Sequence, residues 1–541
     1  MMKKVIKKLL AALLAVAMLC AMAIPAFAYN PGETEEDLNT KHDYGAFQIF
    51  TGDVSDDNTT ISNVGWGESI PNHEDFLEKL KEDLTIGNQF SNAKTAQDVL
   101  MVISTWDDSD DDSIAFARFV CKYLYPTADA KPEPDDTGHT GGFEIRKPGY
   151  YLIVDISPFH EDDFYHAYNS FLLKVTKAPY HVIIKHKVVK PTVEKKVYDN
   201  DNNDISSAGG WGSSADHAIN EKFQFQLIAK LPASKDNGRA YDYYDKYTVC
   251  FNDTLSAGIT FDNLDTVKIA NVDGGDSKEI TNYKFDDTDL HEAGHPTSFK
   301  LSIDNVKTCA AAAGLNLNDG ATITVTYTAH LNDKATVNTA NGSNTTDNKN
   351  SVFLQYSNNP RIDTSLDYTT TSEVCVYTYQ LNNTKYRDEV NENNKLEGAG
   401  FRLYSDEACT EEQEVKLYKK GNFYYPIKDA TGKKAVEMIS GENGQFNVKG
   451  LDAGTYYLKE TITPAGYDTC GVTPVTIKAD HSGNDHVNLE GSNLTIVNKK
   501  AGGITLPSTG GIGTTIFYVV GGGLMVAAIV LLVTKKRMEN K

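Results

Sequence analysis

The sequence predicts an all-β chain of tandem immunoglobulin-like sandwiches, with a short helical insert in its N-terminal part and a hydrophobic helix near its C-terminal end. The 541 residues include 29 Tyr and 41 Gly, and Thr, Val, Asn and Asp are also frequent, as in proteins of strands and turns. Apolar and polar residues alternate over short runs at a spacing typical of sandwich domains. Only Phe76 to Leu84 and Thr95 to Thr105 have the pattern of short helices.

The charge balance is acidic, with a net charge of −22, which argues against nucleic acid or an anionic membrane surface as a partner. The 13 His residues are scattered, and the sequence has no GxSxG, HExxH, phosphate-binding Gly loop or clustered His and Cys ligands. We therefore expect no enzyme, no cofactor and no metal site. The aspartates between Asp107 and Asp112 could bind calcium. However, this run lacks the Gly and the final Glu of an EF-hand loop, so a solvated loop is the favoured interpretation.

The first residues have the pattern of a secretory signal peptide. Lysines begin the segment from Met1 to Ala28, an apolar stretch follows, and Ala26-Phe27-Ala28 forms a cleavage site. The mature chain is expected to begin near Tyr29, in a compartment that allows disulfides. Six cysteines remain after this processing, and their wide spacing does not determine which of them pair.

Three features follow one another at the C-terminal end. Leu506-Pro507-Ser508-Thr509-Gly510 precedes an apolar run from Ile516 to Val533, close to the ~20 residues that span a bilayer. The basic residues Lys535 to Arg537 would hold the end in the cytoplasm. This order resembles the LPxTG cell-wall sorting signal of Gram-positive surface proteins. The resemblance implies that a sortase cleaves between Thr509 and Gly510, and that the secreted chain passes from transient membrane retention to covalent anchoring in the cell wall.

Changes of composition divide the chain into five segments. These are a signal peptide at 1–28, an N-terminal domain at 29–186, a middle domain at 187–366, a C-terminal domain at 367–500, and the sorting signal with its transmembrane helix at 501–541. The N-terminal domain should open with a strand from Tyr44 to Phe50 and close with strands at Gly149–Asp155 and Ser170–Val175. Its acidic and Pro-rich stretch Lys131–Thr137 is expected to be an exposed loop.

Strand parity points to buried polar groups in the C-terminal domain. Alternate residues of a strand share a face, so Glu460 shares one with Tyr456, Leu458 and Ile462. The same phase puts Lys385 in the first strand and Asn498 in the last strand among apolar neighbours. Three buried polar groups are costly unless a reaction or a set of hydrogen bonds compensates.

The segment from Gly454 to Tyr467 resembles the G-x-Y-x-L-x-E-x-x-x-P-x-G-Y signature of collagen-adhesin B-type domains in Gram-positive pilins. The resemblance implies a spontaneous isopeptide bond between Lys385 and Asn498, promoted by Glu460. Burial lowers the pKa of a Lys and raises that of a carboxyl. The neutral amine can then attack the Asn carbonyl while the protonated carboxyl polarises it.

The middle domain resembles the collagen-adhesin A-type domain, because Phe251 to Phe261 matches its D-T-L-x-x-G-L/I-T-F stretch. The resemblance implies a second isopeptide bond. Strand phase selects Lys195 as the amine and Asp253 as the carboxyl. It selects Asn350 as the acceptor, with Asn348 as the alternative.

The N-terminal domain has no clear inward Lys in its first strand, so we expect no bond there, and Asp155 is expected to be a hydrogen-bonding residue or a remnant. Shaft subunits of this family also carry a pilin-motif Lys between the first two domains. Alignment on the Pro191 segment gives Lys187 this role, although the Tyr and Pro of the motif are absent. Lys185 and Lys190 remain alternatives.

These resemblances imply the major (backbone) subunit of a sortase-assembled pilus. A pilin-class sortase would form an acyl-enzyme at Thr509, and Lys187 of the next copy would resolve it. The implied partners are that sortase, a housekeeping sortase, further copies of the chain, ancillary pilins, peptidoglycan and a host surface ligand that serves adhesion and colonisation. The alternative is a monomeric wall-anchored adhesin or an ancillary (tip or base) pilin, which would not use a pilin-motif Lys.

Overall fold

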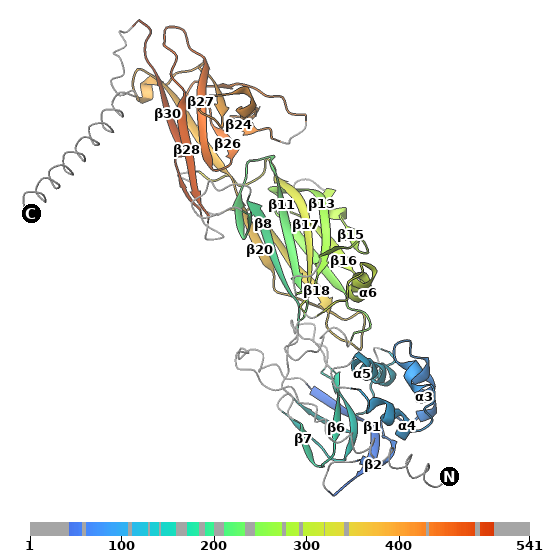
Figure 1. Ribbon diagram of the computed structural model, residues 1–541. Helices are drawn as coiled ribbons and strands as arrows, with labels where there is room; N and C mark the ends of the chain where they lie inside the picture. The colour runs from blue at the N-terminus through green and yellow to red at the C-terminus, as the bar shows by residue number, and fades with distance from the viewer. Residues whose placement is uncertain are drawn as a thin grey trace, which may run out of the picture.

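The computed structural model is a row of three β-rich domains placed end to end (Figure 1). The structure describes residues 43–56, 61–106, 111–127, 130–139, 142–157, 170–182, 190–199, 210–232, 244–272, 277–291, 296–318, 320–339, 346–428, 432–481 and 487–502. The expected signal peptide, Lys185, Lys187, the LPSTG segment and the expected transmembrane helix lie outside these residues. Within them, no helix is long and apolar enough to cross a membrane.

The N-terminal domain consists of a main sheet covered by helices and a separate two-stranded sheet. Its strands run in the order β2-β1-β5-β6, with β3 also paired to β1, and β4 pairs separately with β7. The strands are β1 Asp43–Val54, β2 Ile61–Trp66, β3 Asp136–His139, β4 Phe143–Ile145, β5 Gly149–Asp155, β6 Ser170–Val175 and β7 Tyr180–Val182. The expected strands at the two ends of this domain are therefore present.

Four helical segments cover this sheet, namely α3 His73–Glu82, η1 Gly87–Phe90, α4 Ala96–Ile103 and α5 Asp111–Leu124. The two predicted helices correspond to α3 and α4, but their ends differ. Thr95 is the N-cap of α4 and not part of the helix, and Leu84 lies beyond the end of α3 and is fully exposed. The expectation of a loop throughout Asp107–Asp112 was wrong at its end. Asp111 and Asp112 form the first turn of α5, where negative charge is favoured by the helix dipole.

The Pro-rich stretch Lys131–Thr137 was also expected to be an exposed loop, but Asp136 near its end is buried. Asp136 begins β3 and is buried, and its carboxylate accepts a hydrogen bond from the backbone N–H of Arg146 at 3.1 Å. Asp135 accepts hydrogen bonds from the Gln48 N–H and the Ser69 hydroxyl, each at 2.7 Å. These carboxylates satisfy backbone and side-chain donors, which is why an acidic segment can pack against the sheet.

The middle domain is a sandwich of two sheets. One has the order β10-β20-β18-β12-β16-β15, with β19 paired to β18, and the other has the order β14-β13-β17-β11-β8-β9. The strands are β8 Thr192–Asp199, β9 Gly210–Gly212, β10 Ser214–Asp216, β11 Lys222–Lys230, β12 Val249–Leu255, β13 Ile259–Ala270, β14 Lys278–Glu279, β15 Lys284–Asp286, β16 Thr297–Ile303, β17 Thr322–Leu331, β18 Lys349–Ser357, β19 Leu366–Tyr368 and β20 Ser372–Tyr377. The helical segments are η3 Thr288–His291 and α6 Val306–Ala312.

The C-terminal domain is a second sandwich, with sheets in the orders β23-β24-β26-β21-β30 and β25-β22-β27-β28-β29. The strands are β21 Tyr379–Arg387, β22 Gly400–Tyr404, β23 Leu417–Lys420, β24 Phe423–Pro426, β25 Met438–Ile439, β26 Val448–Leu451, β27 Gly454–Ile462, β28 Thr473–Asp480, β29 Asn488–Glu490 and β30 Asn493–Asn498, with short helices η4 Glu392–Asn394 and η5 Glu411–Gln413. The first strand, β21, lies parallel to the last strand, β30. This pairing brings the two ends of the domain together.

Specific contacts join the successive domains. On the N-terminal side, Arg118 and Lys122 of α5 pair with Asp245, and the Arg361 guanidinium lies 4.8 Å from the centre of the Tyr125 ring. Between the middle and C-terminal domains, the backbone N–H of Ile219 donates to the Gly450 carbonyl at 2.9 Å. This hydrogen bond joins two backbone groups, so it restrains the middle and C-terminal domains more closely than an ion pair between flexible side chains would.

Candidate functional site

The C-terminal domain brings together the three residues that strand parity placed inward. Lys385 of β21, Glu460 of β27 and Asn498 of β30 are 0%, 5% and 0% exposed. Asn498 lies beside Lys385 because β21 and β30 are neighbours, and Glu460 reaches them from the opposite sheet. The parity argument was wrong at Ile462, which is 45% exposed. The pairing of β22 with β27 shifts register between Glu460 and Ile462, so the alternation ends there.

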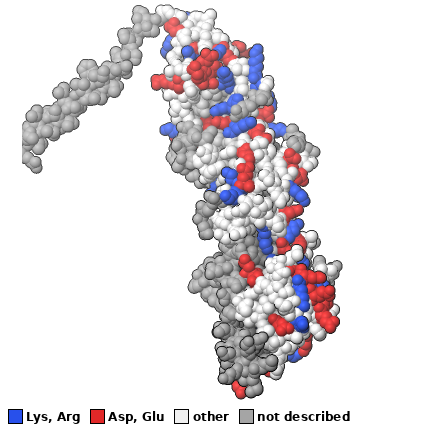
Figure 2. Space-filling model, turned by 45° about the vertical axis from the view of Figure 1, so that its right-hand side comes forward, with Lys and Arg blue, Asp and Glu red and all other residues white. Residues whose placement is uncertain are grey.

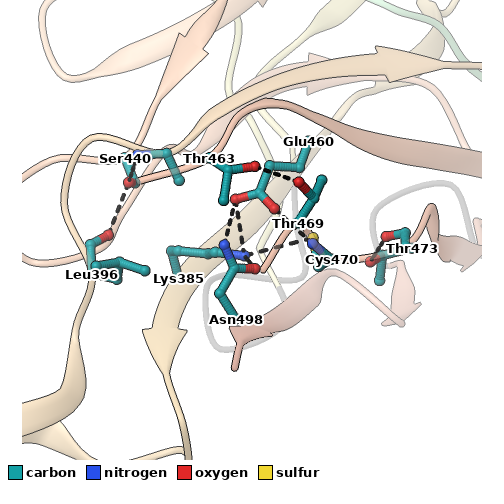
Figure 3. Close-up of polar contacts among 11 residues, drawn as sticks. Lys385, Leu396, Ser440, Glu460, Thr463, Thr469, Cys470, Thr473 and Asn498 are labelled. Carbon is teal, nitrogen blue, oxygen red and sulfur yellow. Dashed lines mark hydrogen bonds and ion pairs between the residues drawn. The ribbon is translucent and has the colours of Figure 1, made fainter. Parts of the chain in front are cut away.

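The contacts within this group are short. The Lys385 Nζ donates to the Asn498 Oδ1 at 2.5 Å, and the Asn498 Nδ2 donates to the Glu460 Oε1 at 2.7 Å. The same Oε1 lies 3.5 Å from the Lys385 Nζ. Figure 3 shows the carboxylate facing both the amine and the amide. One carboxyl oxygen can therefore exchange protons with the attacking nitrogen and with the leaving nitrogen.

Cys470 completes this site and was not expected from the sequence. Its backbone N–H donates to the Glu460 Oε2 at 2.7 Å, and the Lys385 Nζ lies 3.6 Å from its sulfur (Figure 3). Burial raises the pKa of its thiol to about 11, so the thiol stays neutral beside the amine. The second oxygen of Glu460 is thus held by the backbone, which leaves the first oxygen for the Lys and the Asn.

In the middle domain, Lys195 of β8, Asp253 of β12 and Asn350 of β18 are also buried, at 2%, 0% and 0% exposed. The Lys195 Nζ forms a salt bridge with the Asp253 carboxylate across the sandwich. Lys196, its neighbour in sequence, is half-buried and pairs with Glu194. The alternative acceptor Asn348 is buried, but its side chain bonds the backbone of Thr336 and Val376.

Tyr327 of β17 lies at the centre of the middle-domain group and was not predicted from the sequence. Its hydroxyl accepts from the Lys195 Nζ at 3.1 Å and from the Asn350 Nδ2 at 2.5 Å, and it donates to the Asp253 Oδ1 at 3.0 Å. The Asn350 Oδ1 accepts no hydrogen bond from any described residue. In the sequence, Tyr327 alternates in phase with Val325 and Ala329, which indicates that its hydroxyl points into the core. Only the fold shows which groups that hydroxyl contacts.

The electrostatics of the middle-domain group favour neutral side chains. Burial lowers the pKa of Lys195 to about 8, although the nearby Asp253 partly opposes this shift. Burial likewise raises the pKa of Asp253, against the opposing influence of Lys195. Moving one proton from the amine to the carboxyl removes both charges from a low-dielectric core, so an amine nucleophile and a protonated carboxyl become accessible together.

The N-terminal domain has a different buried polar group on its first strand. Gln48 of β1 is 1% exposed, and its amide donates to the Pro148 carbonyl and to the Tyr151 hydroxyl, each at 3.0 Å. Asp155 is fully buried, and its Oδ1 accepts from the N–H and the hydroxyl of Ser157 at 3.0 and 2.6 Å. Gln48 and Asp155 therefore make hydrogen bonds within the domain. Among the candidate pilin lysines, only Lys190 lies within the described residues.

All six cysteines of the expected mature chain lie in the described part of the structure, and none forms a disulfide there. They are Cys121, Cys250, Cys309, Cys375, Cys409 and Cys470. Five are buried, and burial raises the pKa of the Cys121 thiol to about 11. Cys309, Cys121 and Cys375 pack as small apolar side chains in three separate cores.

Two family models match the chain. Residues 383–493 match a prealbumin-like fold domain, and residues 498–540 match the LPXTG cell wall anchor motif. The prealbumin-like match covers the sandwich that holds Lys385 and Glu460. The chain is therefore a secreted protein that is anchored covalently to the cell wall and built from immunoglobulin-like β-domains.

Sequence relatives and solved structures were also found. Serine-aspartate repeat-containing protein C of Staphylococcus aureus is 31% identical over 189 residues, which are 34% of this chain and 19% of that protein, so the match spans about a fifth of the relative. The T6 backbone pilin of Streptococcus pyogenes covers 86% of this chain and 97% of its own, with 16% identity and a TM-score of 0.44. The major pilin SpaD of Corynebacterium diphtheriae covers 88% and 95%, with 16% identity and a TM-score of 0.42.

Proposed function

We propose that this wall-anchored protein is the shaft subunit of a cell-surface pilus, polymerised by a sortase and strengthened by intramolecular Lys–Asn isopeptide bonds. The arrangement of Lys385, Glu460 and Asn498, in a chain that ends with an LPXTG anchor, supports this function most directly. A fibre that carries tension needs domains that cannot unfold when their ends are pulled. A bond between the first and last strands of a domain provides that property.

The bond in the C-terminal domain forms between the Lys385 Nζ and the Asn498 Cγ. The amine attacks the amide carbon, the bond from Cγ to Nδ2 breaks, and Nδ2 leaves as ammonia. Glu460 accepts a proton from the Lys nitrogen and returns it to the leaving nitrogen, both of which it already contacts. Fixed positions replace a bimolecular encounter, which removes most of the entropic barrier.

The bond in the middle domain joins Lys195 to Asn350, with Asp253 in the role of the carboxyl. Tyr327 contacts all three side chains, and its hydroxyl carries protons between the amine and the amide. The buried ion pair favours the neutral amine when one proton moves to Asp253. The reaction again releases one ammonia.

Polymerisation uses the two ends of the mature chain. A pilin-class sortase cleaves after Thr509 and holds the chain as an acyl-enzyme, and Lys187 of another copy takes up the acyl group. A housekeeping sortase transfers the last subunit to peptidoglycan. The pilus formed in this way, with its ancillary pilins, supports adhesion to a host surface ligand. Lys185 and Lys190 compete with Lys187 for the role of acceptor.

Immunoblotting of the wall fraction tests this function. The fraction is released enzymatically, boiled in detergent with reductant, and probed for this chain. We expect a ladder of high-mass species that Lys187→Arg abolishes, with Lys177→Arg as the control outside the expected motif. A single band near the monomer mass in a sortase-competent cell would contradict the shaft role and favour a monomeric adhesin or an ancillary pilin.

A further inference from the structure

A buried cluster of ionisable side chains lies at the junction of the middle and C-terminal domains, and it shares no residue with either isopeptide group. Asp199 ends β8, Asp216 ends β10, and His481 follows β28 of the next domain. Their exposed fractions are 2%, 0% and 1%. Two carboxylates and an imidazole are seldom buried together unless something neutralises them.

The spacing of the three side chains suits a shared ion. The His481 Nε2 lies 3.6 Å from the Asp216 Oδ1 and 3.8 Å from the Asp199 Oδ2. Both distances are too long for N–H to O hydrogen bonds. A tetrahedral ion with bonds of about 2.0–2.2 Å keeps its ligand atoms about 3.3–3.6 Å apart. All three ligand atoms lie within 4.8 Å of one another, so a small relaxation would bring them around one ion.

Neighbouring hydrogen bonds orient the imidazole and one carboxylate. The Ser214 hydroxyl donates to the His481 carbonyl at 3.0 Å and lies 2.8 Å from the His481 Nδ1. Because a hydroxyl has one hydrogen, the Nδ1–H donates to it, and Nε2 is directed at the two carboxylates, where it presents a proton or, once deprotonated, a lone pair. Such a bond to the second nitrogen is typical of metal-binding His residues.

Asp216 is held in a similar way. Its Oδ2 accepts from the Ala453 N–H at 3.2 Å, while its Oδ1 points toward His481 and accepts no hydrogen bond from any described residue. A fully buried carboxylate oxygen needs a positively charged partner. A proton on His481 supplies that charge, and a metal ion that displaces this proton would bind both side chains.

A second group at the same junction is less suited to a metal. His217, Glu221 and Asp452 also lie close together. However, Glu221 pairs with Lys428 at 3.4 Å and accepts from the Ala218 N–H at 3.2 Å, and Asp452 accepts from the Ala453 N–H at 3.0 Å. The carboxylates of this group already have partners within the protein, and they provide a comparison.

We propose that Asp199, Asp216 and His481 bind one divalent ion of the zinc class and thereby tie the middle domain to the C-terminal domain. One imidazole nitrogen with two carboxylates suits zinc, whereas calcium and magnesium favour oxygen ligands alone. Water would take the fourth position. The two carboxylates balance the charge of the ion, which explains why they can be buried. The site is independent of the pilin function and of the isopeptide bonds.

Titration of the metal-stripped mature chain with Zn²⁺, followed by calorimetry and native mass spectrometry, tests the site. We expect one ion per chain at micromolar affinity or tighter, and a melting temperature that rises with Zn²⁺ and falls again with a chelator. Asp216→Asn and His481→Gln should each weaken binding at least about tenfold. Glu221→Gln, in the comparison group, should leave it unchanged.

Two results would overturn the proposal. One is a wild-type chain that takes up no Zn²⁺, a result that does not depend on whether any variant folds. The other is binding that Asp216→Asn and His481→Gln leave unaltered, which would place the ion elsewhere. Intact mass of each variant should still show the loss of ammonia from both isopeptide sites, which separates a lost metal site from a misfolded chain. Tighter binding of Ca²⁺ than of Zn²⁺ would contradict the zinc class.

Discussion

At the scale of single residues, the two proposed cross-links use different polar surroundings. Glu460 contacts Lys385 and Asn498 directly, and a backbone N–H holds its second oxygen. In the middle domain the Tyr327 hydroxyl stands between the amine and the amide. Lys195, Asp253, Asn350, Lys385, Glu460 and Asn498 were all chosen from strand phase and motif, and all six are buried. Tyr327 and Cys470 were not chosen, because no local pattern distinguishes a Tyr or a Cys that contacts such a site from one that only fills the core.

Glu460→Ala should prevent the bond in the C-terminal domain. Without the carboxyl, no group relays the proton from the Lys385 amine to the leaving nitrogen. The intact mass of the mature chain should therefore be heavier by one ammonia than the mass change of the substitution itself predicts. Glu490→Ala, at an exposed position of the same domain, is the matched control and should keep the bond. If the Glu460→Ala chain still loses both ammonia molecules, the proposed role of Glu460 is contradicted.

The middle-domain pair predicts a pH dependence in a variant that cannot cross-link. In Asn350→Ala, Lys195 stays free with its pKa lowered to about 8 from the usual 10.5. Between these values the unfolded chain binds a proton that the folded chain does not, so stability rises with pH in this window. Below pH 8 both states hold the proton, and this dependence disappears.

Denaturant unfolding at pH 7 to 10 measures the effect. Lys195→Met combined with Asn350→Ala is the control, because it has the same missing amide and no amine. Equal slopes of stability against pH in the two variants would show that the pKa of Lys195 is not lowered in the fold.

At the scale of elements, the positions of the two cross-linked strands decide what a cross-link can do. In the C-terminal domain, β21 and β30 lie side by side and parallel, so the proposed bond would join neighbours within one sheet. In the middle domain, β8 and β18 lie in opposite sheets, so the bond would cross the sandwich. Lys385 and Asn498 are separated by 113 positions, and closing a loop of this size removes roughly 4–5 kcal/mol of unfolded-chain entropy by analogy with a disulfide.

Pulling on the two ends of the mature chain should reveal the bond in the C-terminal domain. Force enters near Lys385 and leaves near Asn498, so a covalent bond between them shields the 113 positions in between. Asn498→Ala should release this segment, with a contour of about 370–400 Å at 3.3–3.6 Å per residue. Single-molecule force spectroscopy measures the step. The wild type should lack it, and so should Asn488→Ala, a control at another Asn of the domain.

The β class and several individual strands could be predicted at this scale, and the helices only in part. Strands β5 and β6 matched their expected bounds because alternation and flanking turns are local signals. Helix α5 was missed because its N-terminal aspartates were interpreted as a solvated run, although its buried residues include Phe116 and Val120 at helical spacing. A run of acidic residues in the first turn of a helix has the same composition as an acidic run in a loop, so composition alone does not distinguish the two.

At the scale of the whole molecule, the chain is a rod of domains with charged side chains of both signs interspersed along the face shown in Figure 2. In the proposed fibre, its junctions would transmit force between domains. Ion pairs such as Lys420 with Asp333 join the middle and C-terminal domains, beside the hydrogen bond between Ile219 and Gly450. The proposed metal site lies at the same junction and would stiffen it.

Gly450→Ala should weaken this junction. The residue has φ +84°, and an added Cβ would lie 2.5 Å from the Ile219 side chain of the middle domain. Gly421→Ala is a matched control, since its φ is +60° but nothing lies within 4 Å of an added Cβ. We expect both changes to cost about 1 kcal/mol from backbone strain, and Gly450→Ala to cost more because Ile219 must move. Thermal unfolding of the mature chain checks this, and equal costs would show that the contact is unimportant.

The sequence by itself determined the all-β class, the wall anchor and the inward phase of the candidate cross-linking residues, because alternation, signature motifs and processing signals are written in consecutive residues. Only the tertiary structure decided which buried groups meet. It brought Tyr327 to Lys195, placed the amide of Asn498 against Glu460, and gathered Asp199, Asp216 and His481 at one junction. These groups come from strands far apart in the chain, and their contacts depend on sheet order and on how two domains pack, which local patterns do not encode.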